Sequence, residues 1–263
     1  MQDMQEKETQ EQEADTGAFE VIEQDQHKQP HKGVYLLPNL FTTAALFAGF
    51  YAIVAAMNGK FVDAAVAIII AGILDGMDGG VARMTNTQSK FGAEYDSLSD
   101  CVAFGVAPGL VAYAYGLHGL GRWGWVAAFI YVACAALRLA RFNVQAATSD
   151  KRFFTGLPSP SAAGLVATMI WYGADSGVPG ADISWLVALV TAGAGLLMMS
   201  NVKFHSFKEF HIGRVPFRVL VGVIIAFAII FLNPPLVLLT VAVVYTLSGL
   251  VLGVLSWQRG VNR

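Results

Sequence analysis

Eight apolar stretches, separated by short polar turns, decide what this chain can fold into. They cover residues 39–57, 62–82, 97–117, 123–142, 161–174, 183–200, 215–232 and 236–257. A bilayer core about 30 Å thick is crossed by roughly 20 helical residues, because a helix satisfies its own backbone hydrogen bonds without water. With 55% hydrophobic and only 14% charged residues, the chain has too little polar surface to cover a soluble domain. We therefore expect an all-α integral membrane protein with about eight transmembrane helices.

Lysine and arginine are distributed very unevenly over the turns. If both termini lie on one side of the membrane, that side holds all but two of the 17 basic residues. The two exceptions are Lys60 and Arg122. Because cytoplasmic loops carry the excess of positive charge, both termini are expected in the cytoplasm.

The first 32 residues differ physically from the rest of the chain. Residues 1–25 contain nine acids against a single basic residue, Lys7. Such a polar segment cannot bury enough apolar surface to offset the entropy lost on ordering. We expect a disordered acidic cytoplasmic tail at 1–32, followed by a polytopic transmembrane domain at 33–263.

Acidic residues interrupt the second and third apolar stretches where the two meet on the cytoplasmic side. At 100° per residue, Asp75, Asp78 and Arg83 share one face of the second helix, and Asp96 and Asp100 share one face of the third. Consecutive spans run antiparallel, so these faces can point four carboxylates at one another. The active site is therefore expected at the cytoplasmic ends of helices 2 and 3.

Four carboxylates at membrane depth need a cation among them. By insertion scales an acid at mid-membrane costs about 2.5–3.5 kcal/mol, and anions repel more strongly where water is excluded. Arg83 cannot balance four carboxylates, whereas one or two Mg²⁺ or Mn²⁺ ions with oxygen ligands can. Gly79, Gly80 and Gly92 leave space for a ligand or a facing helix to approach.

A cation or proton transporter is the alternative from a different class, because intramembrane acids also line transport paths. Such a path would need polar residues that continue toward the outer face. The outer halves of the spans are nearly free of ionisable groups, apart from Asp63, Asp175 and Asp182 near the ends. The acid site is therefore one-sided, which favours an enzyme.

Residues 75–100 contain the pattern D-x2-D-G-x2-A-R-x8-G-x3-D-x3-D. This pattern resembles the signature of the CDP-alcohol phosphatidyltransferases at every fixed position. The resemblance implies that Asp75, Asp78, Asp96 and Asp100 bind two divalent ions, and that Asp100 accepts the proton of the attacking hydroxyl. It also implies contacts with the CDP-linked lipid at Gly79, Arg83, Ser89, Pro38 and Asn39.

The segments around this pattern are most similar to those of the bacterial membrane-embedded phosphatidylserine synthases. They are residues 96–108, 138–143, 154–160 and 206–208. The resemblance implies CDP-diacylglycerol and L-serine as substrates, phosphatidylserine and CMP as products, and a bacterial inner membrane location. Because the motif is shared by the whole family, glycerol phosphate or inositol phosphate remains open as acceptor. The family also suggests a homodimer, and nothing suggests a nucleic-acid partner.

Serine needs a cation for its carboxylate. Arg138, Arg141 and Lys208 lie on the expected cytoplasmic side. We favour Arg141 together with Asn143, because the preceding apolar helix would hold them below the metal site, and we add Lys208 as a further candidate. Basic residues at these positions also satisfy the positive-inside rule with no substrate contact.

Overall fold

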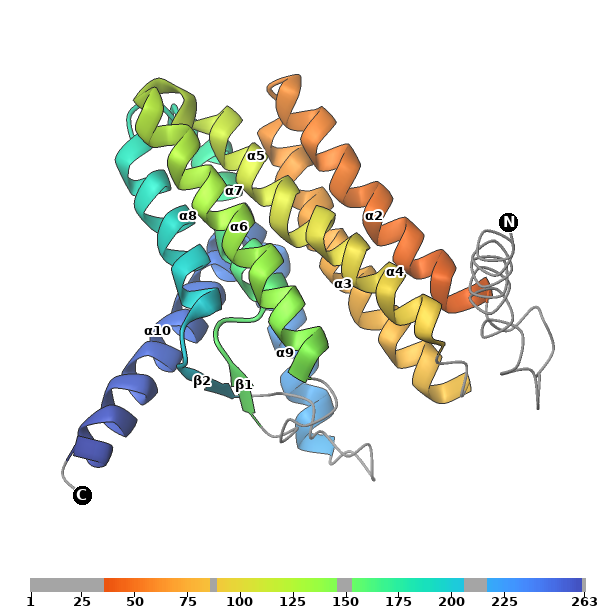
Figure 1. Ribbon diagram of the computed structural model, residues 1–263. Helices are drawn as coiled ribbons and strands as arrows, with labels where there is room; N and C mark the ends of the chain where they lie inside the picture. Colours follow the sequence, from red (N-terminus) through yellow and green to blue (C-terminus); the bar gives the residue numbers. More distant parts are fainter. Residues whose placement is uncertain (1–35, 86–88, 146–152, 206–216, 262–263) are drawn as a thin grey trace, which may run out of the picture.

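The computed structural model describes residues 36–85, 89–145, 153–205 and 217–261 (Figure 1). The expected tail at 1–32 and Lys208 lie outside these ranges. The described residues form the helices α2 (Leu36–Met57), α3 (Phe61–Thr85), α4 (Lys90–Asp100), α5 (Ala107–Tyr115), α6 (Arg122–Gln145), α7 (Ser159–Asp175), α8 (Ser184–Met199), α9 (Phe217–Leu232) and α10 (Pro234–Val261). Each of the eight apolar stretches lies mainly on helix, as the sequence predicts.

The described chain departs from an all-helical fold at one place, where two three-residue strands pair. Strands β1 (Phe153–Thr155) and β2 (Lys203–His205) are antiparallel, with Phe154 opposite Phe204. They lie near the end of α6, at the same end of the molecule as the acid-bearing part of α3 (Figure 1). Three residues a strand are too few to produce a visible alternation of apolar and polar residues in the sequence.

Four segments of the described chain are long and apolar enough to cross a membrane. They are Asn39–Met57, Lys90–Tyr115, Arg122–Val144 and Pro234–Val251. Helices α7, α8 and α9 have 17, 16 and 16 residues and are short for a full span. The described residues therefore contain four candidate membrane spans by length and composition, which supports a membrane protein, while the count of eight stays a prediction.

The third span differs from the expected uninterrupted helix at 97–117. Helix formation starts earlier, at Lys90, because the Ser89 side chain caps the helix by accepting a hydrogen bond of 2.9 Å from the Gly92 backbone N–H. Directly after Asp100 the chain turns π-helical over η1 (Cys101–Val106) before α5 begins. Wider turns of this kind recur at functional sites, and here one follows the last acid of the motif.

Small residues hold α2, α3 and η1 in close contact. Alanines line the buried sides of α2 and α3, among them Ala52, Ala64 and Ala71, each fully buried. A Cβ atom at Gly49 of α2 would lie only 2.7 Å from the Ala103 Cα of η1. Helix association within lipid depends on such close packing, because lipid tails are as apolar as leucine. This packing fixes the relative position of the helices that carry the acids.

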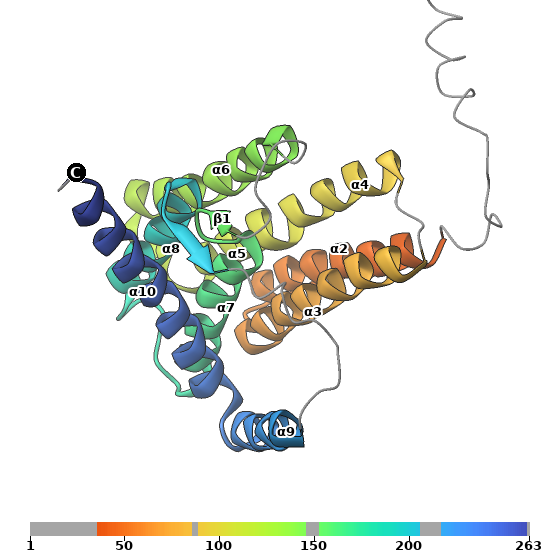
Figure 2. The same cartoon turned by 90° about the horizontal axis from the view of Figure 1, so that it is seen from below.

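Helices α2, α3 and α4 lie together on one side of the molecule, and α6, α7, α8 and α10 lie on the other (Figure 2). Helix α9 stands apart and packs mainly on α10. The short α2–α3 turn is at one end of the bundle, and the last turns of α3 with the start of α4 are at the opposite end (Figure 1). The two ends therefore offer separate surfaces for function.

Candidate active site

Three aspartates from two helices converge at the α3–α4 end of the bundle. Asp75 and Asp78 lie on α3 and Asp96 lies on α4, and one carboxylate oxygen of each is within 4.8 Å of the others. We call these three residues the aspartate cluster. At an effective dielectric constant near 20, two unit charges 4 Å apart repel by about 4 kcal/mol. A bound cation would relieve this repulsion among the three carboxylates.

Asp100 completes the set of four motif acids from the end of α4. Its carboxyl group interacts with those of Asp75 and Asp96. It therefore adjoins the aspartate cluster and lies where the regular helix gives way to η1. The structure thus brings together the four acids that the sequence singled out.

Helix α2 orients the cluster through a hydroxyl group. The Thr42 side chain donates a hydrogen bond of 2.6 Å to the Asp78 carboxylate, and both residues are buried. The Ser99 hydroxyl in turn donates to the Thr42 backbone carbonyl at 3.0 Å. Sequence reasoning missed Thr42, because a hydroxyl within an apolar helix also bonds its own backbone and carries no motif.

The donor set of the cluster fits a hard divalent ion. All of its side-chain ligands are carboxylate oxygens, which suit Mg²⁺ and Mn²⁺. The Asp96 Oδ1 atom is buried and has no hydrogen-bond partner among the described residues. An unpaired buried carboxylate oxygen is costly, and a metal ion would satisfy it. The cluster can therefore hold a metal ion.

Open space adjoins the cluster along the last turns of α3. A Cβ atom added at Gly76, Gly79 or Gly80 would meet no atom of another described residue within 4 Å. These glycines are thus not required for contact between helices. Their bare backbone leaves room beside the acids for a bulky ligand.

Gly92 has the opposite environment. A Cβ atom there would lie 3.1 Å from the Ser89 Oγ and 3.5 Å from the Asn39 Oδ1. Asn39 at the start of α2 and Ser89 before α4 therefore meet around this glycine. The structure brings these two predicted nucleotide-site residues together, with Pro38 in the first turn of α2 and Arg83 in the last turn of α3.

The predicted serine-binding residues are less closely grouped. The Asn143 side-chain amide donates to the Ser97 hydroxyl at 3.0 Å, and that hydroxyl is 3.3 Å from the Asn143 Oδ1 atom. Asn143 therefore contacts the residue that follows Asp96 in the sequence. Arg141 donates instead to the Asn201 side chain at 3.0 Å, beyond the end of α8. Lys208 lies outside the described residues.

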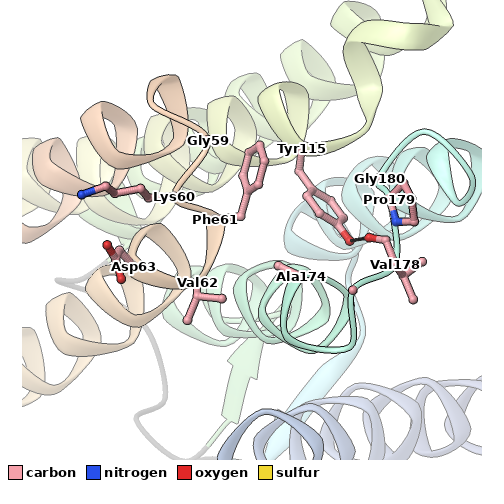
Figure 3. A pocket seen from close by; sticks show the side chains of 11 residues that line it. Gly59, Lys60, Phe61, Val62, Asp63, Tyr115, Ala174, Val178, Pro179 and Gly180 are labelled. Carbon is pink, nitrogen blue, oxygen red and sulfur yellow. Dashed lines mark hydrogen bonds between the residues drawn. The ribbon is translucent and has the colours of Figure 1, made fainter.

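A cavity of about 510 Å³ opens at the opposite end of the bundle. It lies where the α2–α3 turn meets the α7–α8 connection, and the Tyr115 hydroxyl closes one side by donating to the Val178 carbonyl at 2.7 Å (Figure 3). Lys60 and Asp63 lie at its edge, away from Tyr115 (Figure 3). With one acid and one base at its rim, this cavity lacks the converging carboxylates found at the other end. The aspartate cluster is therefore the stronger candidate for chemistry.

Comparison with known proteins agrees with the motif. A sequence profile of the family described as CDP-alcohol phosphatidyltransferase matches residues 35–196, a range that includes all four acids. Relatives named CDP-diacylglycerol–serine O-phosphatidyltransferase occur in several bacteria. The Helicobacter pylori protein is 37% identical over 233 residues, covering 87% of this chain and 93% of its own.

Two further relatives carry the same name. The Mycobacterium tuberculosis protein is 37% identical over 193 residues, or 69% of this chain and 64% of its own. The Bacillus subtilis protein is 33% identical over 173 residues, or 66% of this chain and 92% of its own. Together with the profile match, these similarities confirm the family expected from the motif: the chain belongs to the CDP-alcohol phosphatidyltransferases.

Proposed function

We propose that this protein transfers the phosphatidyl group from CDP-diacylglycerol to L-serine, giving phosphatidylserine and CMP. The observation that carries the proposal is the convergence of Asp75, Asp78 and Asp96, with Asp100 beside them. Family membership supports the reaction type, and the relatives named for serine support the acceptor. Family membership therefore favours an enzyme over the cation or proton transporter that was the alternative from the sequence.

The four aspartates would hold one or two Mg²⁺ or Mn²⁺ ions. When bound, such ions neutralise the pyrophosphate and stabilise charge on the departing CMP. Thr42 keeps the Asp78 carboxylate in a fixed orientation through its hydrogen bond of 2.6 Å. Fixed ligand orientation is what partners of metal-binding carboxylates generally supply.

The CDP-linked lipid is proposed to lie against the open glycine surface of α3. Gly79 leaves room there for the pyrophosphate, and Arg83, on the next turn of the helix, supplies positive charge for it. Asn39 and Ser89, which meet around Gly92, would contact the nucleotide, with Pro38 shaping the start of α2. The acyl chains would leave the site between helices into the inner leaflet.

Asp100 is proposed as the general base. It accepts the proton of the serine hydroxyl as the hydroxyl oxygen attacks the phosphorus attached to diacylglycerol. A new oxygen–phosphorus bond forms, and the bond from that phosphorus to the oxygen of CMP breaks. Positioned proton transfer of this kind contributes typically 10²- to 10⁴-fold to a rate. Arg141, Asn143 and Lys208 stay candidates for the serine side of the site.

The distribution of basic residues supports the proposed placement in the membrane. Eight spans with both termini in the cytoplasm would put the aspartate cluster on the cytoplasmic side of a bacterial inner membrane. CDP-linked lipid in the inner leaflet and soluble serine could both reach it there. A homodimer is the assembly that the family suggests.

The experiment is to incubate the purified protein with CDP-diacylglycerol, Mn²⁺ or Mg²⁺, and one radiolabelled alcohol at a time. We expect release of CMP that depends on serine, with label appearing in phosphatidylserine. If label is incorporated from glycerol phosphate or inositol phosphate instead, serine is the wrong acceptor, but the proposed phosphatidyl transfer still holds. Absence of CMP release with every acceptor and both metals would overturn the proposal.

A further inference from the structure

Arg138 on α6 is a buried cation near the proposed base. Its side chain is 9% exposed, and no other Lys or Arg whose exposure the structure describes falls in the buried class. Burying a guanidinium group is expensive unless an anion and a full set of hydrogen-bond acceptors surround it. The positive-inside rule concerns residues in loops, so it does not explain a buried cation within a helix.

The described residues satisfy only part of this guanidinium. Its Nη1 atom donates to the Ser159 hydroxyl of α7 at 2.8 Å. Its Nε atom is buried and has no hydrogen-bond partner among the described residues. A neutral hydroxyl does not balance the charge, so the guanidinium has donor capacity for an anion.

Asp100 is the acid that interacts with Arg138. The same carboxylate also faces Asp75 and Asp96, so its charge is shared with the aspartate cluster. Asp100 therefore interacts both with the aspartate cluster and with Arg138.

Several hydroxyl groups lie close to the Arg138 side chain. Tyr245 of α10 interacts with the guanidinium and is in hydrogen-bonding contact with the Ser161 side chain of α7. Ser159 and Ser161 of α7 and Tyr245 of α10 thus bring three hydroxyl groups close to the Arg138 side chain of α6. A cation with hydroxyl groups beside it offers partners for both ends of a small zwitterion.

We propose that Arg138 binds the carboxylate of the acceptor amino acid and so selects serine over amino alcohols that lack a carboxylate. The proposal rests on the function proposed above. In this arrangement the serine hydroxyl lies at Asp100 and the serine carboxylate at Arg138, the cation with which Asp100 interacts. The planar fork of a guanidinium matches the two oxygens of a carboxylate. Arg141, favoured from the sequence, already donates to Asn201.

The experiment compares Arg138→Gln and Arg138→Lys with the wild-type enzyme on two acceptors, serine and serinol, which replaces the carboxylate with a hydroxymethyl group. We expect Arg138→Gln to raise the KM for serine about 10- to 100-fold, the usual range for a lost charge-assisted hydrogen bond. The KM for CDP-diacylglycerol should stay unchanged, and the kcat/KM for serinol should fall much less than that for serine. Arg138→Lys should retain more of the preference for serine than Arg138→Gln does, because lysine keeps the positive charge but lacks the planar guanidinium group.

Three outcomes would overturn the assignment. Equal losses with serine and serinol would give Arg138 a structural role, and a rise in the KM for CDP-diacylglycerol would assign it to the lipid pyrophosphate. An unchanged KM for serine would leave it without a substrate contact. Serine-dependent CMP release by the wild-type enzyme tests the proposed function separately, so the two failures are distinguishable.

Matched variants guard against a folding defect. Arg122→Gln removes an exposed arginine from the opposite end of the same helix and should leave both acceptors unaffected. Ser159→Ala removes the hydroxyl that holds the Arg138 Nη1 atom and should raise the KM for serine several-fold, a smaller effect than loss of the charge itself. If Arg138→Gln does not fold, an unchanged KM for serine in Ser159→Ala would overturn the proposal.

Discussion

The Thr42 hydroxyl donates a hydrogen bond of 2.6 Å to the Asp78 carboxylate, across 36 residues of sequence and between two helices. Thr42 belongs to α2, which carries none of the four acids, so a third helix takes part in shaping the site. Both side chains are buried, at 4% and 5% exposure, so water cannot replace this bond. Asp78 therefore has its Oδ2 atom held by a residue of another helix.

Replacing Thr42 with valine should weaken metal binding. Valine keeps the shape of the side chain but removes the donor, so the Asp78 carboxylate loses its fixed orientation. Loss of a partner to a metal ligand typically costs 10- to 100-fold in metal affinity or activity. We expect the Mn²⁺ concentration for half-maximal activity to rise within that range.

The matched control for this variant is Thr168→Val. Thr168 is equally buried, but its hydroxyl donates to the Gly164 carbonyl of its own helix, away from the acids. It should leave the Mn²⁺ dependence unchanged. The same Mn²⁺ dependence in Thr42→Val and in the wild type would show that the hydrogen bond does not serve the metal site.

Asp100→Asn should separate catalysis from binding. The amide cannot accept the proton of the attacking hydroxyl, so kcat should fall by about 10²- to 10⁴-fold. Asp75, Asp78 and Asp96 remain in place, so the affinity for CDP-diacylglycerol, measured by competition with a labelled analogue, should change little. Asp182→Asn, an exposed acid before α8, is the control and should match the wild type. Near-normal turnover in Asp100→Asn would remove the base assignment.

Helical periodicity predicted much of this site. A rotation of 100° per residue puts Asp75 and Asp78 on one face of α3, and Asp96 and Asp100 on one face of α4. Because consecutive spans run antiparallel, these two faces can point toward each other. The structure shows that the three cluster acids do meet within 4.8 Å. Their role as metal ligands stays a prediction, because proximity alone does not identify an ion.

Features that depend on packing between distant helices could not be read from the sequence. Whether Arg138 is a buried cation or a loop charge depends on how α6, α7 and α10 meet, and periodicity does not give that. The π-helical stretch after Asp100 has no pattern of its own within an apolar run. Lengths of apolar runs predicted the helices well, but they do not decide whether a 16-residue helix such as α9 crosses the bilayer.

Gly49→Ala and Gly79→Ala should have opposite effects, although both add one methyl group to a helix. At Gly49 the new Cβ would lie 2.7 Å from the Ala103 Cα, so α2 and η1 must separate, and overpacking of this kind costs typically 1–3 kcal/mol. At Gly79 the methyl meets no atom of another described residue within 4 Å, and alanine in a helix is favoured over glycine by roughly 0.5–1 kcal/mol.

The measurements for this pair are thermal unfolding in detergent and the KM for CDP-diacylglycerol. Gly49→Ala should unfold at a lower temperature than the wild type. Gly79→Ala should unfold at the same or a higher temperature, but its KM for CDP-diacylglycerol should rise, because the methyl takes space proposed for the lipid pyrophosphate. An unchanged KM in Gly79→Ala would place the CDP-linked lipid elsewhere.

Asp96→Asn tests the electrostatic basis of the whole site. Without metal, the carboxylates of Asp75, Asp78 and Asp96 repel one another across less than 4.8 Å, so removal of one charge should raise the unfolding temperature of the EDTA-treated protein. Addition of Mn²⁺ or Mg²⁺ should then stabilise the wild type strongly and the variant little, because ligand-induced stabilisation follows affinity for the folded state. The exposed acid Asp63, at the opposite end of α3, supplies the control: Asp63→Asn should respond to metal as the wild type does. If metal stabilises Asp96→Asn and the wild type equally, the cluster is not where the ion binds.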